Sequence, residues 1–170
     1  ATAGLLALTV PALAQGPGTP FMRRPDISGD HVVYSSEGDL WLGSLTNGTA
    51  RRITSDVGQE SWPRFSPDGK SIAFTGQYDG GTDIYVMAAE GGGLPKRLTW
   101  DPLGARAVGW TPDGSAVLFR SRRQSPDRKP RLWAVPPTGG MPTPYAIPKA
   151  EHSALAADGN RTPSDHIQTI

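Results

Sequence analysis

Short runs of consecutive apolar residues recur along the chain, separated by turn sequences rich in glycine and proline. The runs at 32–34, 72–74 and 117–119 are Val-Val-Tyr, Ile-Ala-Phe and Val-Leu-Phe. A strand with one wetted face would alternate apolar and polar residues, so consecutive apolar positions indicate strands that are covered on both faces. The pattern therefore predicts short β-strands in sheets that have a neighbour packed against each side.

The turn sequences return at a fixed interval. The Asp-Gly pairs at 68–69, 113–114 and 158–159 are spaced 45 residues apart. In the first two pairs a proline precedes the aspartate, and proline at the second position with glycine at the fourth is typical of a type I turn between antiparallel strands. An interval of about 45 residues matches one four-stranded blade of a β-propeller.

Four strands are expected in each unit, and in the second unit they are expected at 61–66, 71–76, 83–88 and 95–99. An aromatic residue occupies one equivalent position in the third strand of the three units: Trp41, Tyr85 and Trp133. We expect these rings to pack between adjacent blades, because a repeated aromatic usually serves packing. Stacking against a ligand is the alternative.

The sequence thus predicts an all-β fold, a partial β-propeller of four-stranded antiparallel blades. Three blades are expected at about 25–54, 60–99 and 106–148, and a fourth begins at 151–161. The tail at 162–170 lacks the apolar strand that should follow. A propeller needs at least four blades, and six would need about 270 residues at this period. We therefore expect the chain to be the front part of a larger protein, and its blades to belong to a six-bladed propeller.

The first residues have the form of an export signal. An uncharged apolar stretch covers about 3–13, and Ala-Leu-Ala at 12–14 has the small-x-small pattern of a signal-peptidase site. We expect a truncated signal peptide at 1–14 and a linker at 15–24 before the propeller at 25–161, and hence an exported protein, periplasmic or secreted. A buried strand or helix is the alternative. The stretch is too short for a membrane span, so none is expected after removal of the leader.

Composition narrows the classes of function. The 170-residue chain has a formal net charge of +1, so no global field would recruit nucleic acid or an anionic membrane. It contains no cysteine, which excludes disulfides, thiolate metal sites and a cysteine nucleophile within it. Its 21 glycines and 17 prolines suit many short strands that are joined by tight turns.

No catalytic or metal-binding constellation is evident. His31 lies in the first apolar strand, where we assign it a structural role, and His152 only adjoins Ser153, which is no triad geometry. His166 lies in the atypical tail. Motifs for a nucleophile elbow, a P-loop, a dinucleotide site or a zinc protease are missing from the sequence. We therefore predict no catalytic, cofactor-binding or metal-binding residue in this chain.

One basic segment, between the second and third strands of the third unit, is the candidate binding feature. Its cations are Arg120, Arg122, Arg123, Arg128, Lys129 and Arg131, against the single acid Asp127. We hypothesise a cationic rim that steers anionic groups, such as peptide C-termini or acidic side chains. A solvated loop is the alternative. Nucleic acid is not expected as a partner, because no aromatic platform interleaves with these charges.

Longer stretches of the three units carry a resemblance to a known family. They are 25–41 in the first unit, 62–69, 83–87 and 96–100 in the second, and 108–123 in the third. Together they resemble the N-terminal β-propeller of tricorn-type serine peptidases. The Pro-Asp-Gly blade alone is less specific, because TolB-like and WD-like propellers, prolyl-oligopeptidase relatives and some amidohydrolases also have such repeats.

The resemblance implies a non-catalytic propeller segment of an exported tricorn-like serine peptidase, which gates or channels peptides to a distant catalytic domain. It implies as partners the remaining blades and catalytic domains of the full-length chain and peptide substrates, and no cofactor. None of the family's catalytic positions falls within this chain, and assembly into homo-oligomers stays open. The alternatives are a TolB-like periplasmic protein-binding module and the propeller of an amidohydrolase.

Overall fold

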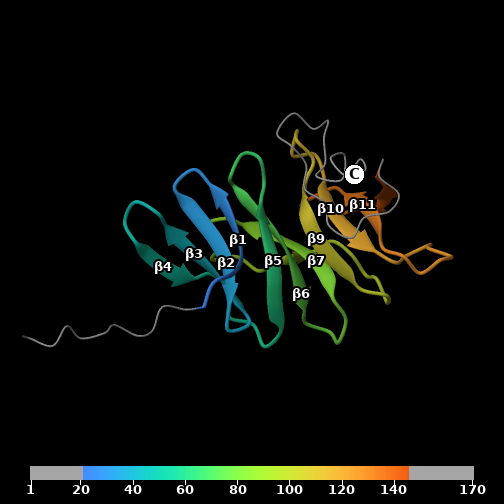
Figure 1. Ribbon diagram of the computed structural model, residues 1–170, viewed down its shortest axis with the longest axis horizontal. Coiled ribbons are helices and arrows are strands. Elements are labelled where there is room, and N and C mark those ends of the chain that lie inside the picture. Colours follow the sequence, from blue (N-terminus) through green and yellow to red (C-terminus); the bar gives the residue numbers. More distant parts are fainter. Residues whose placement is uncertain (1–20, 146–170) are drawn as a thin grey trace, which may run out of the picture.

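The computed structural model describes residues 21–145, and residues 1–20 and 146–170 lie outside the described part. All regular elements within 21–145 are β-strands. They form three four-stranded antiparallel sheets, each built from consecutive strands (Figure 1). The predicted all-β fold with four-stranded antiparallel sheets is confirmed. The predicted leader, the start of the fourth unit and the tail lie outside the described residues.

The strands follow the repeat closely. The first sheet contains β1 (Arg23–Ser28), β2 (His31–Ser36), β3 (Asp39–Ser44) and β4 (Thr49–Arg52). The second contains β5 (Gln59–Phe65), β6 (Ser71–Gln77), β7 (Asp83–Ala88) and β8 (Lys96–Arg97). The third contains β9 (Ala105–Trp110), β10 (Val117–Ser121), β11 (Arg131–Val135) and β12 (Thr143–Pro144). β1 begins inside the expected linker, and β8 is shorter than the expected strand.

The Pro-Asp-Gly sequences form the hairpin turns between the first two strands of the second and third sheets. The N–H of Gly69 donates to the carbonyl of Ser66 at 2.8 Å, and that of Gly114 donates to the carbonyl of Thr111 at 2.9 Å. Both glycines have a φ of +70°, in the left-handed region that glycine adopts without strain. A type I turn followed by a left-handed residue is a common hairpin connection, so the repeated tripeptide fixes the register of these two sheets.

The middle sheet is covered on both faces, as the consecutive apolar positions predict. Ile72 and Phe74 belong to an apolar cluster shared with the first sheet, which contains Val33, Leu40 and Leu42 among others. Ala73, between them in sequence, belongs to a second cluster shared with the third sheet. Successive side chains of a strand point to opposite faces, so β6 serves two interfaces at once.

The repeated aromatics occupy one structural position, which the strand registers establish. Tyr34 pairs with Trp41, Phe74 with Tyr85 and Phe119 with Trp133. Tyr85 packs in the cluster shared with the first sheet and Trp133 in the cluster shared with the second, so each ring faces the preceding sheet. The predicted packing between blades is therefore confirmed for these two rings. Trp41 lies on the opposite face of β3 from Leu40 and Leu42, away from the second sheet.

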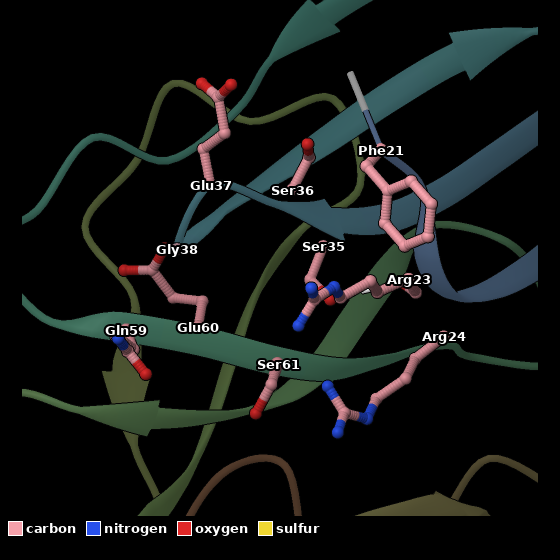
Figure 2. Close-up of a pocket in the computed structure, with 10 residues that line it drawn as sticks. All are labelled: Phe21, Arg23, Arg24, Ser35, Ser36, Glu37, Gly38, Gln59, Glu60 and Ser61. Carbon is pink, nitrogen blue, oxygen red and sulfur yellow. Dashed lines mark hydrogen bonds between the residues drawn. The ribbon is translucent and has the colours of Figure 1, made fainter. Parts of the chain in front are cut away.

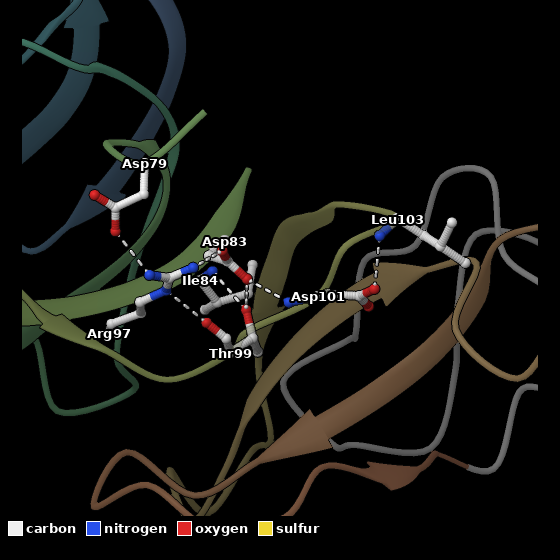
Figure 3. A network of polar contacts seen from close by, with 7 residues as sticks. All are labelled: Asp79, Asp83, Ile84, Arg97, Thr99, Asp101 and Leu103. Atoms are coloured by element: carbon white, nitrogen blue, oxygen red, sulfur yellow. Dashed lines mark hydrogen bonds and ion pairs between the residues drawn. The ribbon is translucent and has the colours of Figure 1, made fainter. Parts of the chain in front are cut away.

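A polar network closes the outer end of each of the first two sheets. In the second sheet the buried Asp83 accepts hydrogen bonds from Thr99 Oγ1 at 2.7 Å, from Arg97 Nη2 at 2.7 Å and from the N–H of Asp101 at 3.0 Å (Figure 3). The N–H of Ile84 donates to Thr99 Oγ1 at 3.0 Å. This network explains why an Arg-x-Thr sequence ends the unit: its side chains direct the chain from β8 into the next sheet.

The first sheet uses the equivalent residues in a similar network, except that Thr54 Oγ1 donates to Glu60 rather than to Asp39. The N–H of Leu40 donates to Thr54 Oγ1 at 2.8 Å, and Arg52 Nη1 pairs with Asp39 Oδ2 at 3.1 Å. In the third sheet Arg131 occupies the position of the aspartate, so this closure is specific to the first two units.

The first strand of each sheet lies on the inner side of the arrangement. β5 contacts both β1 and β9 and lies between them (Figure 1). The three sheets therefore place their first strands side by side, as expected for blades that fan about a shared centre. Side chains of β1, β5 and β9 can therefore meet across the boundaries between blades.

The packing between sheets predicts that two leucines differ widely in how much they contribute to the free energy of unfolding. Leu98 is 1% exposed in the cluster between the second and third sheets, whereas Leu94 is 96% exposed. We expect Leu98→Ala to lower the free energy of unfolding of the propeller by about 2–5 kcal/mol, because it leaves a cavity between sheets. The matched variant Leu94→Ala should change it by less than about 0.5 kcal/mol. Urea denaturation followed by tryptophan fluorescence measures both, and equal effects would contradict the assignment of this interface.

Candidate functional site

The six cations of the predicted rim occupy several different environments. Arg120 lies within β10 and pairs in register with Arg106 of β9, so it belongs to the sheet rather than to the loop. Arg131 begins β11, and its Nη2 lies 3.8 Å from Oδ1 of Asp127. These two cations are therefore placed by their strands.

The remaining four cations lie between β10 and β11. The guanidinium carbon of Arg123 lies 5.2 Å from the ring centroid of Trp133, which holds this cation against the sheet. The cations exposed to solvent in this loop are Arg122, Arg128 and Lys129. A steering role for the rim stays a prediction, and only these three side chains face solvent freely enough to attract a distant anion.

A second group of cations, which the sequence pattern does not indicate, lies on the inner strands. The guanidinium carbon of Arg24 in β1 lies 4.2 Å from the ring centroid of Trp62 in β5. That of Arg106 in β9 lies 4.0 Å from the same centroid. One indole thus contacts two guanidinium groups, and the three residues come from three different sheets. Each such cation–π contact is worth about 0.5–2 kcal/mol, depending on its desolvation.

β-Bulges place two members of this stack. The register of β1 against β2 shifts within 23–26, and the register of β5 against β6 shifts within 61–64. Arg24 and Trp62 have positive φ angles of 51° and 56°, which are uncommon for residues with a side chain. Each is followed by a proline, a residue that sheets tolerate at bulges. This residue–proline pair in two inner strands is the sequence feature that could have located the bulges.

Hydrogen bonds fix the inner strands against one another. Arg64 Nε in β5 donates to the carbonyl of Val108 in β9 at 3.0 Å, and Trp110 Nε1 donates to the carbonyl of Arg64 at 3.0 Å. On the other side, the N–H of Phe65 donates to Asp26 Oδ2 in β1 at 2.8 Å. The position of the Arg64 side chain is therefore set by the neighbouring sheet.

The arginine side chains on and near the inner strands repel one another. The pKa of Arg106 is lowered to about 10, first by burial and then by the positive charges of Arg120, Arg24 and Arg64. Arg106 nevertheless stays protonated at neutral pH, since that value lies well above 7. Burial also raises the pKa of Asp26, against the opposing effects of the hydrogen bond from Phe65 and the charge of Arg64. We call Arg24, Arg64, Arg106 and Arg120 the inner cluster.

An open pocket of about 350 Å³ adjoins the inner cluster between the first and second sheets. Figure 2 shows the guanidinium groups of Arg23 and Arg24 on one side of this pocket and the carboxyl group of Glu60 on the other. Ser36, which is 2% exposed, also lines it, and its buried hydroxyl has no hydrogen-bond partner. Ser35 Oγ donates to the carbonyl of Arg23 at 3.1 Å. The pocket thus combines two cations and hydroxyl groups with the carboxyl groups of Glu37 and Glu60.

Glu60 is held by its own sheet and by the connection that precedes it. It is 2% exposed, and its two carboxyl oxygens accept hydrogen bonds from Thr54 Oγ1 and from the Tyr78 hydroxyl, each at 2.8 Å. Burial raises the pKa of Glu60 in spite of these hydrogen bonds. Burial and the neighbouring carboxyl group also raise the pKa of Tyr78. The arrangement is that of a structural carboxyl group, since both of its oxygens are already engaged.

The histidines and the turn aspartates that the sequence analysis considered do not form a catalytic arrangement within the described residues. His31 is exposed at the start of β2, while His152 and His166 lie outside the described residues. Asp68 and Asp113 accept hydrogen bonds from their own turns, as turn residues do. Within residues 21–145 no group of three or more acidic or histidine side chains could hold a metal ion. The same residues contain no helix that is long and apolar enough to cross a membrane.

Known proteins match most of the chain. The family model of the tricorn protease N-terminal β-propeller domain matches residues 19–169. Tricorn protease homolog 1 of Streptomyces coelicolor is 33% identical over 146 residues, which cover 82% of this chain and 14% of the relative. The tricorn protease of Thermoplasma acidophilum is 32% identical over 147 residues, with 81% of this chain and 14% of that protein covered. The chain thus spans about 14% of the length of these relatives.

Solved structures share the fold. The crystal structure of the tricorn protease matches with a TM-score of 0.69 and 28% identity, over 82% of this chain and 14% of that chain. The crystal structure of TolB from Acinetobacter baumannii matches with a TM-score of 0.63 and 33% identity, over 76% of this chain and 33% of that chain. The three sheets are accordingly three blades of a partial β-propeller.

The buried Glu60 predicts a pH dependence of stability. Its pKa in the folded protein is raised above the ordinary value of 4.5, so its favourable contribution is present below pH 4.5 and is lost as the pH rises through the raised value. We expect Glu60→Gln to gain stability relative to the parent protein as the pH rises from 4.5 to about 7.5.

Urea denaturation of both proteins across this range measures the difference in free energy of unfolding. Glu90→Gln, at an exposed position, is the matched control for the loss of a carboxylate. A loss of stability of Glu60→Gln relative to the parent protein as the pH rises would contradict the burial argument.

Proposed function

The chain belongs to the family of tricorn protease N-terminal β-propeller domains, and from this membership we propose that it is a non-catalytic segment that guides peptides to a catalytic domain of a full-length serine peptidase. The single observation that carries the proposal is the arrangement of the inner strands. β1, β5 and β9 lie side by side and carry cations from three blades. A passage lined in this way would attract the carboxylate groups that every peptide carries.

The proposal includes export. Its support is the leader-like sequence at 1–14, with its Ala-Leu-Ala site, which lies outside the described residues. N-terminal sequencing of the mature protein tests this part independently of activity. A mature start at Gln15 is the expected result, and a start well before that residue would contradict export by this route.

Catalysis itself is assigned to the rest of the full-length protein. A fluorophosphonate probe, which reacts with activated serine hydroxyls, should label the full-length protein outside the propeller. Hydrolysis of unstructured peptides should disappear on labelling. A full-length protein that is neither labelled nor active on peptides would overturn the proposed function.

A second candidate is a docking module for other proteins, in the manner of a TolB-like propeller. The observation that favours it is the 33% identity to TolB from Acinetobacter baumannii. Apolar side chains are also exposed in the connections between sheets, namely Val57, Trp100 and Leu103. Specific binding of an envelope protein by a full-length protein without peptidase activity would favour this candidate over the first.

We call the connection between β10 and β11, residues 122–130, the rim loop. Its cations predict a preference of the enzyme for acidic peptides. We expect neutralisation of Arg122, Arg123, Arg128 and Lys129 to glutamine in the full-length enzyme to lower kcat/KM for acidic peptides about tenfold, because electrostatic steering acts on the association rate. Neutral peptides of the same length should be cleaved at nearly unchanged rates.

The matched control removes four exposed cations elsewhere, at Arg51, Arg52, Lys70 and Lys96, and so changes the net charge equally. It should leave the ratio of the two rates unchanged. An equal loss for acidic and neutral peptides in the rim variant would remove the steering role.

A further inference from the structure

Two departures from the repeat occur close together in the fold. The connection between the second and third strands covers 37–38 in the first sheet and 78–82 in the second, but the rim loop of the third sheet covers 122–130. At the end of the second unit, Trp100 stands where the first unit, 45 residues earlier, has Ser55. Residues that depart from a repeat are not required by its packing, and such departures are expected at functional sites.

Strand pairing places the two departures at one edge of the third sheet. β9 and β10 are antiparallel, and Ser121 at the end of β10 pairs with Ala105 at the start of β9. The rim loop leaves this edge from β10, and the connection 98–104, which contains Trp100, arrives at it. The buried Asp101 joins the two segments, because it accepts a hydrogen bond from the Ser121 hydroxyl. The N–H of Arg123 in turn donates to Ser121 Oγ at 3.0 Å.

The connection from β8 to β9 presents apolar side chains to solvent from a fixed backbone. The N–H of Asp101 donates to Asp83 Oδ1 at 3.0 Å, and Asp101 Oδ1 accepts a hydrogen bond from the N–H of Leu103 at 3.0 Å (Figure 3). Trp100 is nevertheless 67% exposed and Leu103 61% exposed. Exposed apolar side chains on a fixed backbone gain free energy when a partner covers them, and they lose little freedom on binding.

The Trp100 ring is oriented by a neighbouring cation. The guanidinium carbon of Arg97 lies 5.5 Å from the ring centroid. Arg97 is itself held by ion pairs with Asp83 at 2.7 Å and Asp79 at 2.8 Å. Tryptophan is among the residue types that contribute most to the binding energy of interfaces. This ring, held from one side and open to solvent, is therefore suited to anchor a partner.

The rim loop supplies positive charge at the same edge. Arg122, Arg128 and Lys129 are exposed, and none of these three side chains forms an ion pair within residues 21–145. Asp127, the acidic residue of the loop, has its Oδ1 3.8 Å from Nη2 of Arg131. Charge complementarity therefore favours a partner that carries carboxylates.

We propose that Trp100, Leu103 and the rim loop form a docking surface for an acidic peptide segment that carries an apolar side chain. The apolar side chain packs against Trp100 and Leu103, and the carboxylates of the segment meet the cations of the rim loop. Electrostatic steering alone needs no apolar contact, so the requirement for an apolar side chain is specific to docking. The docking surface rests on the proposed function only where the segment is taken to be an incoming substrate, because docking requires no hydrolysis.

Fluorescence anisotropy of labelled peptides, measured with the full-length protein, tests the docking surface. The probe is the peptide Glu-Glu-Phe-Leu-Glu-Glu, blocked at both ends so that only its side chains are charged. One control peptide replaces every glutamate by glutamine, and the other replaces Phe-Leu by Ser-Ser. Prior treatment with a fluorophosphonate blocks an activated serine and so prevents cleavage during the measurement. We expect the probe to bind at least about tenfold more tightly than either control peptide.

Variants locate the binding on the protein. Trp100→Ser introduces the residue that the first unit has at this position, and it should weaken binding of the probe about tenfold because it removes the aromatic anchor. The rim variant Arg122→Gln/Arg128→Gln/Lys129→Gln should weaken binding by a similar factor, and its remaining binding should depend little on salt. If Trp100→Ser does not fold, Leu103→Ser takes its place in the test.

Matched control variants change the same properties elsewhere. Leu94→Ser removes an apolar side chain that is 96% exposed and precedes β8, whereas Trp100 follows β8. The triple variant Arg51→Gln/Arg52→Gln/Lys70→Gln removes as many exposed cations as the rim variant does. Both controls should bind the probe as the parent protein does.

The outcomes separate the docking surface from the proposed function. The docking surface is overturned if the probe does not bind, if either control peptide binds equally well, or if Trp100→Ser or the rim variant binds as the parent does. A dimer of the full-length protein that dissociates on Trp100→Ser would also overturn it, because the occupant would then be a second copy. Peptide hydrolysis and serine labelling are measured on the same preparation. Docking without either of them would leave the surface standing and remove the proposed function, and hydrolysis without docking would do the reverse.

Discussion

Face-to-face burial of small sheets is the constraint on which this structure depends. A four-stranded sheet whose strands are apolar at consecutive positions has two faces to cover, and β6 shows how this is done. Ile72 and Phe74 pack against the first sheet, and Ala73 packs against the third. Because every sheet needs a neighbour on each side, the sheets follow one another about a centre and their first strands come together. The inner cluster is a consequence of this packing, since Arg24, Trp62 and Arg106 meet only when three sheets are in place.

The polar networks at the sheet ends make the packing repeatable along the chain. Asp83 and Thr99 fasten the last two strands of the second sheet and start the connection to the third, and Asp39 and Thr54 occupy the same places in the first. The Pro-Asp-Gly turns fix the register of the second and third sheets at the opposite end. Local hydrogen bonds thus set each sheet, and apolar contacts between sheets set their order. In the proposed function, the side chains that project from the inner strands and the loops are the ones that act on peptides.

The sequence predicted those features that repeat and missed those that do not. The turns, the buried faces of β6 and the shared position of Tyr85 and Trp133 all follow from residues that return in each unit. The stack on Trp62 could not be predicted in this way, because its three residues are spaced 38 and 44 positions apart, off the 45-residue interval. Bulges in β1 and β5 bring them together, and bulges depend on how neighbouring strands pair. The rim was predicted from charge alone, which does not show that Arg120 belongs to a strand.

Packing between the faces of adjacent sheets is the central claim, and a double-mutant cycle tests it most directly. Leu40 in the first sheet and Phe74 in the second belong to one apolar cluster, whereas Leu132 belongs to another cluster in the third sheet. Urea unfolding of Leu40→Ala, Phe74→Ala and the double variant should give a coupling free energy of about 0.5–3 kcal/mol. The pair Leu40→Ala and Leu132→Ala should be additive within about 0.5 kcal/mol. Additivity of the first pair would show that the two sheets do not share a core and would contradict this account.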